Sequence, residues 1–394
     1  MIEIKNKKDC CGCGTCEKAC PKRAISMKPD RIGFLFPEID TDICVECGIC
    51  ENICPVINHC NKENKEHKVF AAYSKDPQTR FEGSSGGMFG ILAKNIISQN
   101  GKVYGAAFDN DLKLKCTSAD TEEALAPLYK SKYLQSDLGD SFYEIERELK
   151  LGKKILFVST PCQVYALKRY LKKDYENLLL VDFVCHGVPS QSFFDECKKF
   201  IEEKEQIKVL DFQFRTKKEN GATPHYYTIT YDKNGKLHKK VKLYVHSPFY
   251  YGFQKYITLR DSCYDCRFSH SNRCSDITIG DFHGIDKYIK GINRFDGVST
   301  VVLNTEKGKN VWETISGNVI YHDIDFETLY NSGELMRGGT EMPIGREEFI
   351  ADLEALPFEQ VFEKHLDGSK EYIKQIYYAL PTFARKFLKN LIGM

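Results

Sequence analysis

Cysteine is the residue type in this chain that is best placed to do chemistry. Of the 394 residues 17 are cysteines, and ten of these lie before residue 61. Two runs in this region share one spacing, with three cysteines separated by two residues, a fourth cysteine three residues further on, and then a proline. They are Cys10, Cys13, Cys16 and Cys20, and Cys44, Cys47, Cys50 and Cys54. Thiols spaced so closely in a cytosolic protein indicate metal binding or redox chemistry.

The spacing is the one that bacterial ferredoxins use to bind two 4Fe-4S clusters, with the fourth cysteine of each run serving the other cluster. It predicts one cluster on Cys10, Cys13, Cys16 and Cys54, and a second on Cys44, Cys47, Cys50 and Cys20. The alternative is a pair of zinc sites, but zinc would leave the repeated third cysteine and the proline unexplained. Cys11 and Cys60 fall outside the spacing and are left over.

Composition excludes several other classes of protein. The net charge is +1, which argues against binding nucleic acid through an overall positive field, and a hydrophobic content of 42% argues against disorder. No apolar run is long enough to span a membrane, and the N-terminus lacks the apolar core of a signal peptide. We therefore expect a cytoplasmic protein with no transmembrane segment and no nucleic-acid partner. A homo-oligomer is one of the assemblies that we consider for it.

The chain divides at a short polar stretch that follows the dense cysteine region. We predict a two-cluster domain over residues 1–58, a linker over 59–68, a core over 69–325 and a helical region over 326–394. In the core, apolar runs at 154–158 and 178–184 lack alternation, as expected of strands buried on both faces of a mostly parallel sheet. Other predicted elements are a strand at 69–73, a helix from residue 88, a hairpin over 103–116 and a β-rich insertion at 208–245.

The fold predicted is thus an α+β ferredoxin-like two-cluster domain fused to an α/β core with a β-rich insertion and a helical C-terminal tail. The last predicted helix, residues 381–394, is amphipathic. We expect it to pack on the core or on a partner subunit; the alternative is a membrane surface.

Several segments of the second half together resemble one family, the coenzyme F420 hydrogenase/dehydrogenase β subunits, in the bacterial form with a fused N-terminal ferredoxin domain. The segments are Ser84-Ser85-Gly86-Gly87-Met88-Phe89, Ser131-Lys132-Tyr133-Leu134-Gln135-Ser136, Ser159-Thr160-Pro161-Cys162-Gln163, Cys185-His186-Gly187-Val188-Pro189, Cys263-Tyr264-Asp265-Cys266 and Gly280-Asp281-Phe282. The resemblance implies a flavin-binding core that holds FAD and a further 4Fe-4S cluster. It also implies electron exchange with a two-electron partner, which is a deazaflavin in the founding enzymes.

The resemblance makes the segment Ser84, Ser85, Gly86 and Gly87 the leading FAD-binding loop. Small residues at the start of a helix suit a pyrophosphate, although the same residues also occur as plain helix caps. Lys132 and Tyr133 are expected to supply a cation and a stacking aromatic ring, the alternative being a surface lysine and a half-buried tyrosine.

By the same resemblance, a third cluster is expected on Cys162, Cys185, Cys263 and Cys266. Cys162 and Cys185 each follow an apolar run, so both would lie at the carboxyl ends of strands, where ligands bind in open α/β sheets. Cys274 is the rival fourth ligand, and a zinc site built from Cys263, Cys266 and Cys274 is a further alternative. Cys116 and Cys197 have no assigned role.

Two further residues are candidates for chemistry in the core. His186, beside a presumed ligand, is expected to donate a hydrogen bond to a cluster or a proton to the flavin, although a structural role is the alternative. Arg215 is expected to attract an anionic partner. The sequence departs from the family at His283 and at 221–222, where the family carries tryptophan, so the substrate cannot be inherited from it.

The function predicted is an iron-sulfur flavoprotein oxidoreductase that passes electrons between 4Fe-4S clusters, FAD and a two-electron small-molecule partner, with an electron-donor or acceptor protein as a further partner. The alternative is an electron-transfer subunit without a substrate site of its own. A third hypothesis is a binding protein with zinc in place of clusters.

Overall fold

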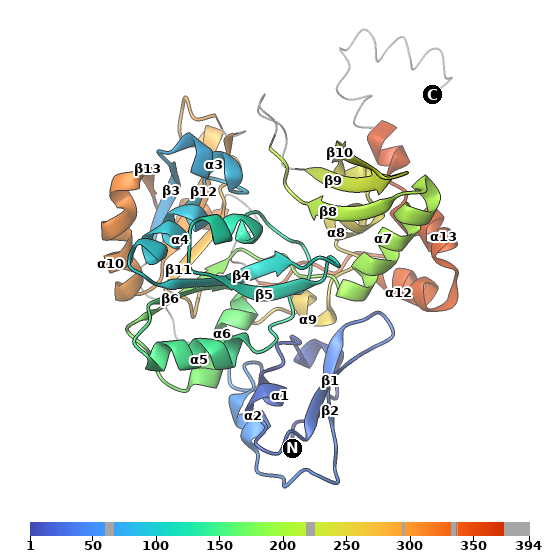
Figure 1. The fold of residues 1–394 in the computed structure, drawn as a ribbon, viewed down its shortest axis with the longest axis horizontal. Helices are drawn as coiled ribbons and strands as arrows, with labels where there is room; N and C mark the ends of the chain where they lie inside the picture. Colours follow the sequence, from blue (N-terminus) through green and yellow to red (C-terminus); the bar gives the residue numbers. More distant parts are fainter. Residues whose placement is uncertain (60–66, 218–224, 294–295, 332–335, 337, 374–394) are drawn as a thin grey trace.

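The computed structural model describes residues 1–59, 67–217, 225–293, 296–331, 336 and 338–373 (Figure 1). The N-terminal part projects from the rest of the molecule and contains helices α1 (Thr15–Ala19) and α2 (Ile49–Ile53) and the antiparallel pair β1 (Ile25–Pro29) and β2 (Leu35–Ile39). Each helix follows a glycine, Gly14 or Gly48, at a φ of 68° or 72°. This left-handed conformation favours glycine, and it turns each cysteine run into its helix in the same way.

The core is built on an eight-stranded sheet with the order β13-β3-β12-β11-β7-β6-β4-β5. Its strands are β3 (Lys68–Ser74), β4 (Lys102–Phe108), β5 (Leu114–Ala119), β6 (Ile155–Ser159), β7 (Leu178–Phe183), β11 (Ile277–Asp281), β12 (Ser299–Leu303) and β13 (Val319–Ile324). The hairpin predicted over 103–116 is confirmed as the antiparallel pair β4 and β5.

The expectation of a mostly parallel sheet is wrong. Only the pairs β4 with β6, β6 with β7 and β7 with β11 are parallel in this sheet, and the other neighbours are antiparallel. Apolar runs report that both faces of a strand are covered, and they say nothing about the direction of its neighbour. The predicted parallel region is confirmed at the centre, where β6 and β7 lie side by side and end at the same edge.

Helices cover both faces of this sheet. The buried side chains of α4 (Met88–Ser98) and α10 (Glu306–Ile315) pack on one face, where Trp312 stacks on Phe70 of β3. The buried side chains of α5 (Ser141–Lys150) and α6 (Pro161–Leu171) pack on the other face against Ile155 and Phe157 of β6. Because these apolar side chains are buried against the sheet, the first residues of α4 and α6 are held in place relative to it. Both helices begin at the site described below.

The predicted β-rich insertion is confirmed as a separate antiparallel sheet, in the order β10-β9-β8 (Figure 1). Its strands are β8 (Lys208–Gln213), β9 (Tyr226–Lys233) and β10 (Lys236–Leu243). An aromatic second core joins this sheet to α7 (Gln191–Glu205), α8 (Pro248–Gln254), α12 (Arg346–Ala355) and α13 (Phe358–Val361). The chain after residue 325 is helical where it is described, apart from turns and loops; the predicted helix 381–394 lies outside the described residues. No described helix is long and apolar enough to cross a bilayer.

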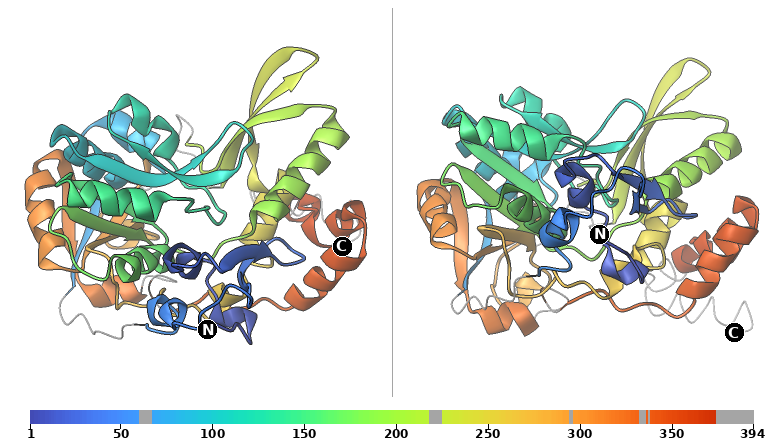
Figure 2. Two further views of the ribbon diagram at one scale, coloured as in Figure 1. Left: turned by 60° about the horizontal axis from the view of Figure 1, so that its bottom comes forward. Right: turned by 90° about the horizontal axis from the view of Figure 1, so that it is seen from below.

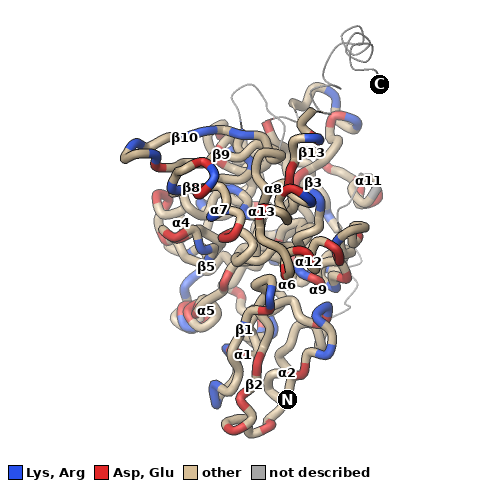
Figure 3. Tube along the Cα trace, turned by 90° about the vertical axis from the view of Figure 1, so that its right-hand side faces the viewer, with Lys and Arg blue, Asp and Glu red and all other residues tan. Residues whose placement is uncertain are grey.

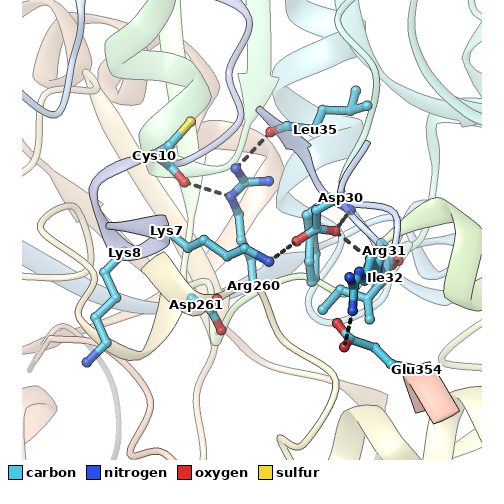
Figure 4. A network of polar contacts seen from close by, with 12 residues as sticks. Lys7, Lys8, Cys10, Asp30, Arg31, Ile32, Leu35, Arg260, Asp261 and Glu354 are labelled. Atoms are coloured by element: carbon cyan, nitrogen blue, oxygen red, sulfur yellow. Dashed lines mark hydrogen bonds and ion pairs between the residues drawn. The ribbon is translucent and has the colours of Figure 1, made fainter. Parts of the chain in front are cut away.

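The N-terminal domain lies against the core through α6 and through α9 (Asp261–Tyr264), as two views show (Figure 2). Arg260, the residue before α9, is 1% exposed and reaches across this contact (Figure 4). Its Nε donates to the carbonyl of Cys10 at 2.7 Å, and a terminal nitrogen donates to the carbonyl of Leu35 at 2.8 Å. The guanidinium also lies 4.3 Å from the centre of the Phe36 ring, so stacking adds to the hydrogen bonds.

Further side chains of the core donate to backbone carbonyls of the N-terminal domain. Gln135 donates to the carbonyl of Cys11 at 2.9 Å, and the Tyr165 hydroxyl donates to that of Asn58 at 2.8 Å. The Ser190 hydroxyl donates to the carbonyl of Ile32 at 2.6 Å. Carbonyls of the cysteine loops are therefore held by the core, and the position of the first predicted cluster depends on that contact.

Replacing Arg260 with methionine tests this contact. The Arg260→Met substitution keeps most of the buried volume but leaves the carbonyls of Cys10 and Leu35 without their donor, so we expect it to lower the free energy of unfolding by about 2–4 kcal/mol. Arg267 also donates to a carbonyl of the N-terminal domain, but its side chain is 48% exposed, and Arg267→Met is expected to cost under about 1 kcal/mol. Urea unfolding followed by circular dichroism measures both, and equal losses would contradict the role given to Arg260.

Candidate functional site

The cysteines of the N-terminal domain gather in two groups. Cys16 is buried with Cys10, Cys13 and Cys54 around it, and burial together with the charges of these thiols raises the pKa of Cys16. The other four, Cys20, Cys44, Cys47 and Cys50, line one small cavity. The structure thus brings together the two sets that the spacing predicts, each with its fourth cysteine taken from the other run.

Backbone N–H groups point at sulfurs of both groups. The N–H of Gly12 donates to Cys10 Sγ at 3.4 Å, the N–H of Ala24 to Cys20 Sγ at 3.3 Å, and the N–H of Ile2 to Cys50 Sγ at 3.3 Å. Such donors stabilise the thiolate form that a cluster requires and tune its potential. The donor set therefore fits two clusters. Among the described residues, no group of three or more His, Cys, Asp or Glu could hold a single metal ion directly.

The four cysteines predicted to hold a third cluster also lie together. Cys162 is in the first turn of α6, directly after β6, and Cys185 follows the neighbouring strand β7. Cys263 lies in α9, and Cys266 follows it. All four line one cavity of about 40 Å³, and burial with the charges of Cys162 and Cys266 raises the pKa of Cys185 to about 12. The thiols of Cys162 and Cys185, at the ends of adjacent strands, thus meet those of Cys263 and Cys266, which begin 78 residues after Cys185 in the chain.

Gly187 allows these segments to approach. It has a φ of 115°, and a Cβ at this position would lie 2.7 Å from Leu259 Cδ1 and 2.9 Å from Cys263 Cβ. Cys274, the rival ligand, lines a different cavity together with Tyr165 and Arg169. The structure therefore groups Cys263 and Cys266 with Cys162 and Cys185 around one cavity, whereas Cys274 lines another cavity and packs against the same hydrophobic cluster as Cys162 and Cys266.

Cys11, which the spacing leaves over, lies between two of these groups. It is 8% exposed and lines the cavity of the four core cysteines. It interacts with both Cys13 and Cys162, and its side chain is the main cause that lowers the pKa of Cys13 to about 6. Cys13 and Cys162 belong to different predicted clusters, so Cys11 links the first ferredoxin group to the core group. Cys60 lies outside the described residues.

A larger cavity of about 370 Å³ lies at the carboxyl ends of β6 and β7, beside the cysteines. Most of the residues predicted to bind the flavin line it, namely Ser84, Ser85, Gly87, Lys132 and Tyr133, together with His186. Gly86 is the exception, because its N–H donates to the Ser299 hydroxyl at 2.9 Å and the residue is packed behind the cavity wall. Of the two departures from the family, His283 lines the cavity, and 221–222 lie outside the described residues.

The loop that precedes α4 has its shape because its glycines leave no room for side chains. A Cβ on Gly86 would lie 2.3 Å from the carbonyl oxygen of Ala72, and a Cβ on Gly87 would lie 2.7 Å from that of Thr79. Gly87 caps α4 in the left-handed conformation, with a φ of 85°. Ser84 Oγ in turn accepts from the N–H of Ser131 at 2.7 Å, which ties the loop to the segment carrying Lys132 and Tyr133.

Arg215 joins three segments of the cavity wall. Its guanidinium forms an ion pair with Asp281 at 2.6 Å, donates to the Tyr133 hydroxyl at 3.1 Å and donates to the carbonyl of Ser84 at 3.1 Å. Burial alone would raise the pKa of Asp281, but the Arg215 charge outweighs it and lowers that pKa to about 2. The expectation that Arg215 attracts an anionic partner stays a prediction, and in this structure the guanidinium is paired with Asp281.

Lys132 and Tyr133 have environments that differ from those expected. The Lys132 ammonium donates to the carbonyls of Pro127 and Tyr129, each at 2.7 Å, and burial lowers its pKa to about 7. The Tyr133 ring stacks on Phe253 at 4.5 Å between centroids, so one of its faces is already covered. Lys132 therefore gains a full charge most readily when an anion enters the cavity beside it.

The larger cavity beside the Ser84 loop and the cavity of the four core cysteines share a wall. Both are lined by Thr160, Gln163, Cys185, Gly187 and Val188. Gln163 is 2% exposed and is held by the hydroxyls of Ser159 and Ser136 and by the carbonyl of Ser136. A ligand in the larger cavity would therefore lie against the residues that enclose the four cysteines.

Two family models match separate parts of the chain. Residues 9–58 match the 4Fe-4S dicluster domain, and residues 152–325 match the C-terminal region of the coenzyme F420 hydrogenase/dehydrogenase beta subunit. The chain is thus similar to a 4Fe-4S dicluster domain near its N-terminus and, over residues 152–325, to the C-terminal region of the coenzyme F420 hydrogenase/dehydrogenase beta subunit. The resemblance seen in the sequence is thus confirmed, and the matched β-subunit region includes Cys162, Cys185, Cys263 and Cys266.

Among solved structures, the chain is similar to one from the F420-reducing NiFe hydrogenase complex of Methanosarcina barkeri. The two are 15% identical with a TM-score of 0.44, and the match covers 79% of this chain and 93% of that chain. The comparison with curated proteins found no match.

Sequence reasoning missed several residues of the site. Asp281 was noted only as part of a motif, and its pairing with Arg215, 66 residues away, had no signal in the chain. Gln163 and Gln135 lie within motifs that the sequence singled out for their neighbours. Gln163 lies in the first turn of α6, four residues after β6 ends, and a polar residue in the first turn of a helix that follows a strand is the signal that would have drawn attention to it.

The packing of the loop that precedes α4 can be tested by adding one methyl group. Gly86→Ala places a Cβ against the carbonyl of Ala72, so we expect it to lower the free energy of unfolding by about 1–3 kcal/mol. The matched control is Gly317→Ala, whose Cβ meets nothing within 4 Å and which is expected to change stability by less than about 0.5 kcal/mol. Thermal unfolding measures both variants, and a neutral Gly86→Ala would contradict the packing described here.

Proposed function

We propose that this chain is an iron-sulfur flavoprotein oxidoreductase that passes electrons between three 4Fe-4S clusters and FAD, to or from a two-electron small-molecule partner. Its domains in this proposal are 1–58 for the ferredoxin part, 69–325 for the flavin-binding core and 326–394 for the helical tail. The observation that carries the proposal is the wall shared by the flavin cavity and the core cysteine cavity. FAD, when bound, supplies a centre that exchanges single electrons on one side and a hydride on the other.

The residues of the chain have distinct parts in this proposal. Cys162, Cys185, Cys263 and Cys266 would hold the third cluster. Ser84, Ser85 and Gly87 would bind polar groups of FAD at the start of α4, with Gly86 shaping the loop from behind and Lys132 supplying a cation. Arg215 would fix the Ser84 loop relative to Tyr133, and His186 is the candidate proton carrier in the cavity.

The cavity offers space and polar groups for a substrate in addition to FAD-binding residues. His225 of the insertion, Gln254 of α8 and His283, which follows β11, also line it. This favours an enzyme with a substrate site of its own over a pure electron-transfer subunit. A smaller ring at position 283 than the tryptophan of the family would leave room for a partner of different shape from a deazaflavin. A cytoplasmic location is part of the same proposal.

Cofactor analysis of anaerobically purified protein tests the proposal directly. We expect about twelve irons, about twelve sulfides and one FAD per chain, because three cubane clusters contain four irons each. Zinc without iron-sulfur absorption would contradict it. Oxidation of reduced deazaflavin or NAD(P)H with a viologen acceptor then separates the two functions, since an electron-transfer subunit would be inactive with every small donor.

The ligands of the core cluster can be tested one by one. Cys162→Ser is expected to remove about four irons per chain and leave the ferredoxin signals in electron paramagnetic resonance intact. Cys116→Ser, on the edge hairpin, and Cys274→Ser serve as controls that should retain all irons. If Cys274→Ser lost the four irons and Cys162→Ser kept them, the ligand set proposed here would be wrong.

A further inference from the structure

The loop between β2 and α2 forms the end of the molecule that is farthest from the core (Figure 1). It contains Cys44 and Cys47, and Cys47 is the only one of the eight ferredoxin-type cysteines in the described structure that is classed as exposed. In the first group, by contrast, the carbonyl of Cys10 accepts from Arg260 of the core, and Cys13 packs against the core cluster formed by β6 and α6. The second cluster site is therefore the one that an external protein could approach.

Large aliphatic side chains on this loop face the solvent. Ile43 is 47% exposed and Val45 is 58% exposed, and each directly flanks Cys44. Val45 also lines the cavity of the second cysteine group. Exposed aliphatic residues around a redox site are typical of a surface that is covered when a partner binds.

Acidic residues surround these side chains. Between residues 32 and 59 the sequence has five carboxylates and no lysine or arginine. Of these, Asp40, Asp42 and Glu46 lie on the loop itself, all three are exposed, and in the described part of the chain none of the three makes an ion pair of 4 Å or less. The charge view shows acidic residues at the end of the N-terminal domain, with basic residues beside them (Figure 3). Lys22 is the exposed basic residue that lines the same cavity as Glu46, so the loop itself is acidic and its neighbour is not.

We propose that residues 40–47 form a docking surface for a soluble electron-carrier protein whose contact face is basic with an apolar centre. Ile43 and Val45 would pack against the apolar centre, while Asp40, Asp42 and Glu46 would attract the basic rim and speed up the encounter. The inference rests on the iron-sulfur part of the proposed function and is independent of the flavin and the substrate.

The test uses the full reconstituted chain, reduced with dithionite, and horse cytochrome c as a basic redox protein. In stopped-flow oxidation at low ionic strength, the double variant Asp42→Lys/Glu46→Lys is expected to lower the second-order rate constant about tenfold and to weaken its dependence on salt. The matched control Glu313→Lys/Glu359→Lys changes the net charge by the same amount, but at sites on α10 and α13. It is expected to change the rate constant less than twofold. Both control residues are exposed.

A second measurement separates binding from electron transfer. Association of zinc-substituted cytochrome c, which accepts no electrons from the chain, is measured by calorimetry with wild type and with Ile43→Ser/Val45→Ser, which should bind more weakly. Iron content is measured on every sample. A chain that contains no clusters would contradict the proposed function, and the iron content distinguishes that outcome from a failure of docking alone. Equal rate losses in the two charge variants, or no loss in either, would overturn the docking surface.

Discussion

The buried guanidinium of Arg260 holds the loop of the first cysteine run against the core, and the proposed electron path depends on this contact. A buried cation is costly unless its donors are used, and here the donors meet the carbonyls of Cys10 and Leu35 and the side chain of Gln135. Gly12 completes the fit, since a Cβ there would lie 2.6 Å from the Arg260 guanidinium. Because Arg260 also begins the helix that carries Cys263, one residue positions parts of two cysteine groups.

From this contact the sites follow one another through the molecule. The second ferredoxin group lies at the free tip and the first lies against the core, and Cys11 of the first run lines the cavity of the four core cysteines. The core group then shares a wall with the cavity that the Ser84 loop, Lys132 and Arg215 surround. Both cavities lie where β6 and β7 end, so the central parallel strands position them together.

The sequence predicted what depends on local spacing. The two cysteine runs need only neighbours along the chain, and the glycines of residues 84–87 act within a few residues. Cys162 and Cys185 could be grouped because each follows an apolar strand. Long-range pairs left no such trace: Arg260 lies 250 residues from Cys10, and Arg215 lies 66 residues from Asp281. The directions of β3, β12 and β13 were missed for the same reason, since an apolar run does not indicate whether the neighbouring strand is parallel or antiparallel.

The most direct test of the account follows the flavin after anaerobic mixing with a donor that reduces the ferredoxin domain. It compares wild type with Cys185→Ser, each loaded with FAD and each with its ferredoxin clusters verified by electron paramagnetic resonance. If the core cysteines connect the two parts, flavin reduction monitored by its visible absorption should slow by at least tenfold in Cys185→Ser. Reduction at the wild-type rate without the core cluster would contradict the account.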